Sequence, residues 1–344
     1  MIRSAPPTTQ IAALTGSRFL AALSVGVFHI PFVLPLTSEG LVSFDIGSLG
    51  VNFFFVLSGF VIEYSTDLSK WNTKNFLIRR MARVLPLHYV TFLIWTTLFC
   101  GSWGNSLEGK LASGLANILT IHSLLPGDLF NLGFNAVSWS VSCEIFFYVT
   151  FALIRPTKAG ILLIICFIIF MINLPHTMYD YMNNVWPNFW WFNPLGRLPE
   201  FCIGIITARL YGKVNISYLV ASILQISILI LILISLYYNP ELVFGIKHTL
   251  LGLVFGIIVF ALAFQGAISR ALSYSPLEFL GQISFSFYML HHMVFRVVDR
   301  LLSILQSPYI GMMLAFTIVI ILSAAVHFGI ERPMKNYIVR SYAS

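Results

Sequence analysis

Arg18 and His29 are the residues of this sequence whose types and spacing first suggest chemistry, because both lie inside a long apolar segment, residues 11–36. An α-helix turns by about 100° per residue, so eleven steps return the chain to within roughly 20° of the same face. The two side chains would stand about 16 Å apart along one stripe. Such groups are costly in hydrocarbon and usually face a bundle interior or a wet cavity. Since histidine titrates near neutral pH, His29 is a candidate general base.

Three clustered arginines, Arg79, Arg80 and Arg83, precede another apolar segment. Positions 80 and 83 share a helix face, and a guanidinium can hold phosphate oxygens through two hydrogen bonds. The cluster is therefore a candidate binding site for an anionic, phosphate-bearing ligand. A topology signal at the rim of a membrane would have the same composition, and both interpretations stay open here.

Two further signals lie later in the chain. Glu144 would sit one to two turns inside a membrane helix that begins near Trp139, and a carboxylate at that depth needs a partner or a function. Trp139 is a plausible anchor at the membrane interface. His291 and His292 are adjacent, so their side chains point about 100° apart on a helix and at most one is expected to face a given site.

The composition determines the class of protein that must position these residues. Hydrophobic residues make up 58% and charged residues 10% of 344 positions, and the mean hydropathy is +0.86. A soluble domain carries about 25% charged residues, so the chain is expected to be an integral membrane protein. The net charge of +7 does not indicate nucleic-acid binding, because the basic residues alternate with apolar segments. The cysteines lack metal-site spacing, and we expect no metal.

We expect an all-α, polytopic helix bundle of about ten transmembrane helices. Residues 1–10 would form a short cytoplasmic N-terminus with no cleaved signal peptide, 11–335 one membrane domain and 336–344 a cytoplasmic tail. Residues 111–125 are interrupted by polar side chains and favour an interfacial or re-entrant segment. The expected spans are residues 11–36, 47–65, 84–102, 138–154, 159–174, 192–211, 216–237, 248–267, 277–298 and 308–330.

The distribution of basic residues predicts the orientation of this bundle. With ten spans and a cytoplasmic N-terminus, most of the 20 Lys and Arg residues fall on the cytoplasmic side, as the positive-inside rule requires. The exceptions are Lys110, Arg197, Lys247, Arg296 and Arg300. We therefore predict a protein of the inner (cytoplasmic) membrane with both termini in the cytoplasm.

Read in order, the signals resemble the membrane acyltransferase-3 family, whose members O-acylate bacterial surface saccharides and some small molecules. The family pattern begins with Arg or Lys, ten residues and His. It continues with G-V-D-x-F-F-V-L-S-G-F, R-R-x-x-R, W-S-x-x-x-E and S-Y-s-x-Y-x-x-H, and ends in E-x-P. These blocks match residues 18–29, 50–60, 79–83, 139–144, 284–291 and 331–333. Six blocks in one order over nearly the whole chain are highly specific.

Some positions depart from the family pattern. Asn52 stands where many members have Asp, which puts an acidic role there in doubt. Phe285 replaces the usual Tyr, and His292 replaces a common Trp.

The resemblance implies that an acyl group, acetyl by family default, moves from cytoplasmic acyl-CoA to a hydroxyl of a saccharide or lipid-linked saccharide. The arginine cluster, Arg79, Arg80 and Arg83, would then bind the donor. His29 would act as base, with Glu144 orienting it and Arg18 holding the donor or the pore. The remaining candidates would line the substrate site or pore: Asn52, Ser58, Trp139, Tyr288 and His291.

Two rival functions use the same buried polar residues. A transporter or flippase of a lipid-linked saccharide would also need them, and uptake without acyl transfer would favour it. A non-enzymatic membrane partner or sensor is the third alternative. An arginine cluster at the rim, together with an intramembrane His and Glu, favours the enzyme over both.

Overall fold

The computed structural model describes residues 11–33, 46–67, 70–99, 106–154, 157–182, 189–238, 248–305 and 307–343. In this part of the chain all regular structure is helical, as expected. The long helices are α1 (Ala12–Val33), α2 (Ile46–Tyr64), α3 (Thr73–Phe99), α6 (Trp139–Ile154), α7 (Ala159–Met182), α9 (Pro194–Tyr211), α10 (Tyr218–Tyr238), α12 (His248–Ala263), α15 (Ser284–Leu305) and α16 (Pro308–Val326). The short ones are α4 (Leu107–Ile118), α5 (Asp128–Asn131), α8 (Phe189–Phe192), α13 (Ala267–Leu272), α14 (Ser275–Gln282) and α17 (Arg332–Tyr342), with 3₁₀ turns at His122–Leu124 and Ala136–Ser138 and a π-helix at His327–Glu331.

Each of the ten predicted apolar segments contains a helix, but several boundaries were wrong. The third helix, α3, begins at Thr73, eleven residues before the expected start at 84, and the segment 277–298 is divided between α14 and α15. By length and composition four stretches can cross a membrane: Ala12–Ile30, Thr73–Phe99, Ala136–Ile154 and Tyr309–Tyr342. Other apolar helices, including Leu49–Tyr64 and Tyr218–Ile234, are shorter. The chain is thus a helical membrane protein, and the count of ten spans remains a prediction.

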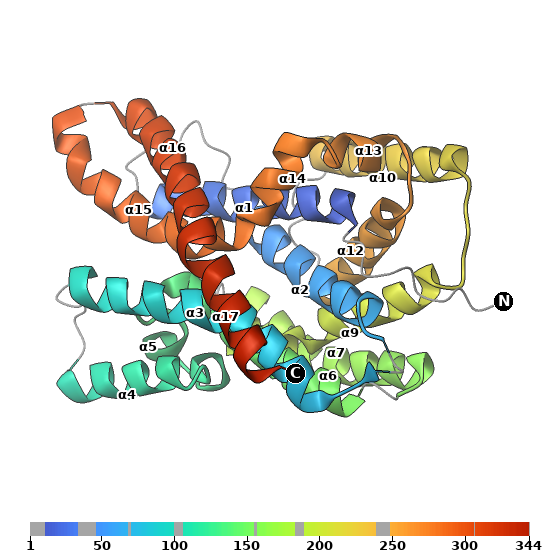
Figure 1. Ribbon diagram of the computed structural model, residues 1–344, viewed down its shortest axis with the longest axis horizontal. Coiled ribbons are helices and arrows are strands. Elements are labelled where there is room, and N and C mark those ends of the chain that lie inside the picture. The colour runs from blue at the N-terminus through green and yellow to red at the C-terminus, as the bar shows by residue number, and fades with distance from the viewer. Residues whose placement is uncertain are drawn as a thin grey trace.

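Helix α1 lies in the middle of the molecule, packed against α2, α14 and α15 (Figure 1). Helices α2 and α9 approach so closely that glycine is required on both. A Cβ on Gly59 would lie 2.0 Å from the carbonyl oxygen of Phe201, and one on Gly204 would lie 2.0 Å from that of Val56. Small residues allow helix backbones to approach in this way inside membranes. Gly59, which belongs to the sequence block of residues 50–60, therefore allows α2 to pack closely against α9.

Replacing Gly59 with Ala is expected to destabilise the protein by about 1–3 kcal/mol, because the added methyl group collides with backbone that cannot move without separating the two helices. Gly160→Ala is the matched control, since a Cβ there meets no heavy atom within 4 Å. Thermal unfolding of the two detergent-solubilised variants, followed by tryptophan fluorescence, measures the difference. Equal melting temperatures would contradict this account of the α2–α9 contact.

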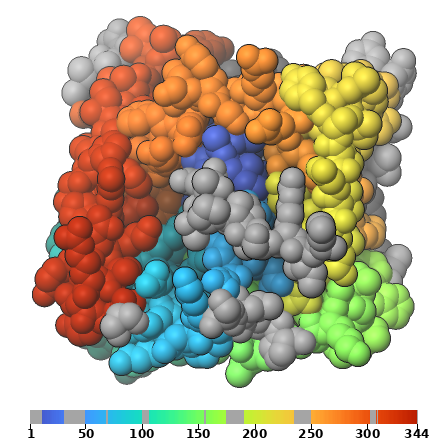
Figure 2. Space-filling view, turned by 45° about the vertical axis from the view of Figure 1, so that its right-hand side comes forward, coloured from blue at the N-terminus to red at the C-terminus, as the bar shows by residue number. Residues whose placement is uncertain are grey.

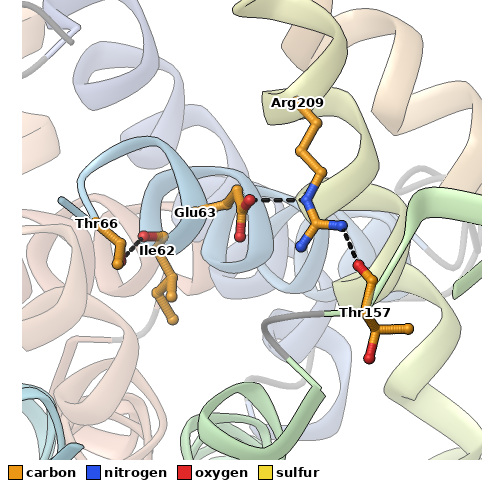
Figure 3. Close-up of polar contacts among 5 residues, drawn as sticks. All are labelled: Ile62, Glu63, Thr66, Thr157 and Arg209. Atoms are coloured by element: carbon orange, nitrogen blue, oxygen red, sulfur yellow. Dashed lines mark hydrogen bonds and ion pairs between the residues drawn. The ribbon is translucent and has the colours of Figure 1, made fainter. Parts of the chain in front are cut away.

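Figure 3 shows the polar contacts that connect one end of this helix pair to the chain after α6. The Arg209 Nε donates to Glu63 Oε1 at 2.7 Å, and Nη1 donates to the Thr157 carbonyl oxygen at 2.5 Å. The two charged side chains are only about one-fifth exposed, at 21% and 19%. A partly buried pair with additional hydrogen bonds contributes more than a surface pair, so this cluster stabilises the ends of α2 and α9 together.

Helix α4 has its apolar and polar faces inverted relative to a soluble protein. Leu107, Leu111 and Leu115 are 73%, 65% and 59% exposed, whereas Ser113 and Asn117 are fully buried. An outward apolar face suits contact with lipid, and twelve residues are too few to span a bilayer. This geometry agrees with the interfacial or re-entrant segment expected around residues 111–125.

Candidate active site

A cationic cavity of about 570 Å³ opens beside α1, where basic side chains from three parts of the chain meet. Figure 2 shows the blue surface of α1 set back between red, orange and cyan surfaces. The basic residues that line the cavity are Arg18 of α1, Arg80 and Arg83 of α3, and Arg332 and Lys335 of α17. This arrangement can hold a polyanion such as a nucleotide with several phosphates.

The three arginines of α3 do not all face the cationic cavity. Arg80 and Arg83 lie one turn apart and both line the cavity, whereas Arg79 is outside the lining. The Arg80 guanidinium donates to Ser65 Oγ at 2.9 Å and lies 5.7 Å from the centre of the Phe76 ring. Two of the three predicted donor-binding arginines therefore face the cavity, and Arg79 does not.

Glu331 is a lining residue whose role was not evident from the sequence. Its Oε2 accepts hydrogen bonds from Ser286 Oγ at 2.8 Å and from His327 Nδ1 at 3.0 Å, and only 7% of the residue is exposed. It ends the π-helix between α16 and α17, a rare element that is frequent at functional sites. The E-x-P block was the signal in the sequence. Glu331 lines the cationic cavity together with Arg18.

A second, narrow cavity of about 50 Å³ shares Arg18 and Arg83 with the cationic one. Glu144, Ser140 and Tyr288 are its other polar lining residues. The Tyr288 hydroxyl accepts from Ser140 Oγ at 2.9 Å and donates to the Val137 carbonyl oxygen at 3.0 Å. Glu144 Oε2 accepts from the Tyr148 hydroxyl at 2.9 Å. The structure thus places Glu144 with Arg18 and Arg83 at one small cavity, whose other walls are largely apolar.

His29 lies against His291, not against Glu144, among the contacts described. His29 Nδ1 and His291 Nε2 are 3.1 Å apart, and the ring centres are 5.0 Å apart. His29 Nδ1 is also 2.8 Å from the Val25 carbonyl oxygen, and His291 Nδ1 is 3.3 Å from that of Phe287. Carbonyl oxygens only accept, so each Nδ1 carries a proton. The single Nδ1 proton of His29 is then shared between the Val25 carbonyl oxygen and His291 Nε2, and the lone pair of His29 is on Nε2, as a general base requires.

His292 also approaches His29, contrary to the expectation that only one of the two adjacent histidines would face a site. Its ring centre is 5.5 Å from that of His29, and its ring stacks on Trp95 at 5.6 Å. Of the two, only His291 reaches His29 with a described hydrogen bond.

Asn52 and Trp139 meet at a buried arginine that the sequence had placed among the outer segments. Arg197 is fully buried in α9, where Nη2 donates to Asn52 Oδ1 and lies 3.5 Å from Glu200 Oε1. The guanidinium also lies 6.0 Å from the centre of the Trp139 ring. Trp139 is 6% exposed, so it is a core residue and not only an interface anchor. Ser58 lies on α2 outside the lining of both cavities.

Two other histidines form a separate buried pair. His88 Nε2 bonds the Asn117 carbonyl oxygen at 3.0 Å, and its ring is parallel to that of His122 at 5.9 Å. Burial lowers the pKa of His122 to about 4, and the neighbouring His88 acts in the same direction. His122 therefore stays neutral at physiological pH, and neither residue lines either cavity. Within the described ranges there is no group of three or more metal-ligating side chains.

Comparison with known proteins gives an independent result. Residues 11–332 match the model of the acyltransferase-3 family, which is described as an acyltransferase domain. "Acyltransferase MdmB" of Streptomyces mycarofaciens is 30% identical over 329 residues, which cover 86% of this chain and 82% of that protein. No solved structure matches the chain.

Two more relatives are 24% identical. "Putative peptidoglycan O-acetyltransferase YrhL" of Bacillus subtilis (strain 168) matches 97% of this chain, and a "Putative O-acetyltransferase" of Staphylococcus aureus (strain COL) matches 95%. The match covers only 56% and 57% of those two proteins, so the chain spans little more than half of their length. The family match and the helical membrane architecture together lead to one conclusion: this chain belongs to the acyltransferase-3 family of membrane acyltransferases and is a transferase of acyl groups other than amino-acyl groups.

Proposed function

We propose that the protein is an O-acyltransferase that moves an acyl group, acetyl in the first instance, from acyl-CoA to a hydroxyl of a cell-surface saccharide. The observation that carries the proposal is the convergence of five basic side chains on one cavity, two of which, Arg18 and Arg83, also line the neighbouring narrow cavity. Coenzyme A is anionic at its nucleotide end, and guanidinium groups bind phosphate well. This charge argues against a transporter of neutral saccharides, and the glycan experiment below separates the enzyme from a transporter or flippase of a lipid-linked saccharide.

The same arrangement supports a route for the donor. The nucleotide phosphates bind Arg80, Arg83, Arg332 and Lys335, and the thioester end enters past Arg18. This route places the cationic cavity on the cytoplasmic side of the inner membrane, in agreement with the predicted cytoplasmic termini.

The acceptor hydroxyl meets the thioester near His29. The Nε2 atom of His29 takes the hydroxyl proton as the oxygen attacks the acyl carbonyl carbon. The C–S bond then breaks, a C–O ester bond remains, and the imidazolium returns the proton to the departing sulfur. His291 holds the ring of His29 in the required tautomer, and its lone pair stabilises the Nδ1 proton during the transfer. Glu144 acts through the charge of Arg18 and not by contact with His29.

The acceptor class is proposed from the relatives, one of which carries peptidoglycan in its name. A peptidoglycan strand, an O-antigen or an exopolysaccharide, free or linked to lipid, offers the hydroxyl that the reaction needs.

Mass spectrometry of the cell-surface glycans tests this function. Deleting the gene is expected to remove the mass of one acyl group from a single glycan species, and a plasmid copy of the wild-type gene should restore it. Glycan masses that are identical in parent and deletion strains, together with altered uptake of a labelled saccharide, would favour a transporter.

A further inference from the structure

The narrow cavity is lined by both polar and aromatic residues. Val51, Phe54 and Phe55 of α2 are spaced by three and four residues, so they share one helix face. Phe285 and Tyr288 of α15 are three residues apart and line the cavity from the opposite helix. The rings of Phe54 and Tyr288 meet edge to face, with their centres 6.1 Å apart.

The size of the cavity limits what it can contain. A single water needs about 10–15 Å³ of this measure, so about 50 Å³ admits a group of roughly three to five heavy atoms. An acetyl group, with three heavy atoms, fits with room to spare, whereas a butyryl group, with five, takes up the whole volume and fits only in an extended conformation. The cavity cannot easily widen at Tyr288, because the hydroxyl of this residue is held by hydrogen bonds to Ser140 and Val137.

The position of the cavity is that of an acyl group in transit. Arg18 and Arg83 belong to its wall and to that of the cationic cavity. On the other side, the Tyr288 ring centre is 5.9 Å from that of His291, which contacts His29. A donor whose phosphates lie among the arginines would therefore bring its acyl end into this chamber before it reaches the histidines.

We infer that the chamber is the acyl-binding subsite and that Phe285, with Phe54, determines the length of acyl chain that the enzyme accepts. The inference rests on the proposed function and adds to it the substrate class: short, unbranched acyl groups, with acetyl preferred. Apolar walls discriminate by exclusion, and one methylene too many in such a pocket changes kcat/KM by about 10–200-fold. Phe285 is the better residue to replace in order to enlarge the cavity. Tyr288 is held by hydrogen bonds and Phe54 packs against Tyr288, so replacing either would disturb other contacts.

The test compares kcat/KM for acetyl-CoA and butyryl-CoA in wild-type protein and in Phe285→Ala, purified in detergent. Wild type is expected to prefer acetyl-CoA by about tenfold or more, and Phe285→Ala to raise the butyryl-to-acetyl ratio by at least about tenfold. Phe146→Ala is the matched control: this phenylalanine is partly buried in the same core and lies outside both cavities. Its ratio should equal that of wild type.

Phe285→Leu gives a milder enlargement in case Phe285→Ala does not fold, and it should shift the ratio in the same direction. An unchanged ratio in both Phe285 variants, with acetyl transfer retained or with both donors lost in proportion, would overturn the inference alone. Wild-type protein that transfers no acyl group from either CoA ester would overturn the proposed function and the inference with it.

Discussion

In His29→Ala, acyl transfer is expected to fall by about 10²–10⁴-fold while acyl-CoA binding is retained. That is the usual contribution of a positioned general base. Because the hydrogen bonds of His29 place its ring proton on Nδ1, Nε2 carries the lone pair that acts as the base. The measurement is kcat for transfer from radiolabelled acetyl-CoA by purified protein, together with the dissociation constant of acetyl-CoA by calorimetry.

Two neighbouring variants separate catalysis from packing. His291→Gln should lower kcat by a smaller factor and alter the pH profile, because His291 Nε2 accepts a hydrogen bond from His29 Nδ1. His292→Gln is the control on the same helix turn, and it should change kcat by only a few-fold, because that ring approaches His29 without a described hydrogen bond. Full activity in His29→Ala would end the assignment of the base.

Replacing Arg80 and Arg83 together with Ala is expected to weaken acyl-CoA binding by about 10²–10⁴-fold. Each charge-assisted hydrogen bond to phosphate contributes about 1.5–3 kcal/mol, and each 1.4 kcal/mol corresponds to a factor of ten. Both side chains line the cationic cavity.

Arg79→Ala is the matched control for this experiment, since it removes the same charge from the same helix but outside the cavity. Its affinity for acyl-CoA should stay within a factor of about three of wild type, because a charge away from the phosphate site contributes little. If Arg79→Ala weakens binding as much as the double variant does, the effect comes from the net charge of the rim and not from a specific phosphate site.

The sequence by itself determined the class of protein and the positions of its helices. Apolar segments are local properties of the chain, and in hydrocarbon a backbone must satisfy its hydrogen bonds within the segment, so each one is helical, although the segment 277–298 is divided between α14 and α15. The same local cost predicts that Arg18, His29 and Glu144 face inward. The acyl-transfer chemistry was also within reach of the sequence, because the family blocks are local patterns of residues and follow one another in the expected order.

Only the tertiary structure decided which of these residues are neighbours. His29 contacts His291, 262 residues away, and Glu144 lies with Arg18 and Arg83 instead. The positions of side chains across two helices depend on how closely and at what angle the helices cross, which small residues such as Gly59 set and hydropathy does not encode.

The sequence also did not predict which basic residues would line the cavity together with the arginines of α3. Arg332 and Lys335 join Arg80 and Arg83 because a π-helix ends at Glu331 and α17 then packs on α3 (Figure 1). A π-helix changes the rotation of everything that follows it, since one additional residue is accommodated in the turn. Local composition determined where the charges occur along the chain; the packing of one helix on another determined that they surround a single cavity.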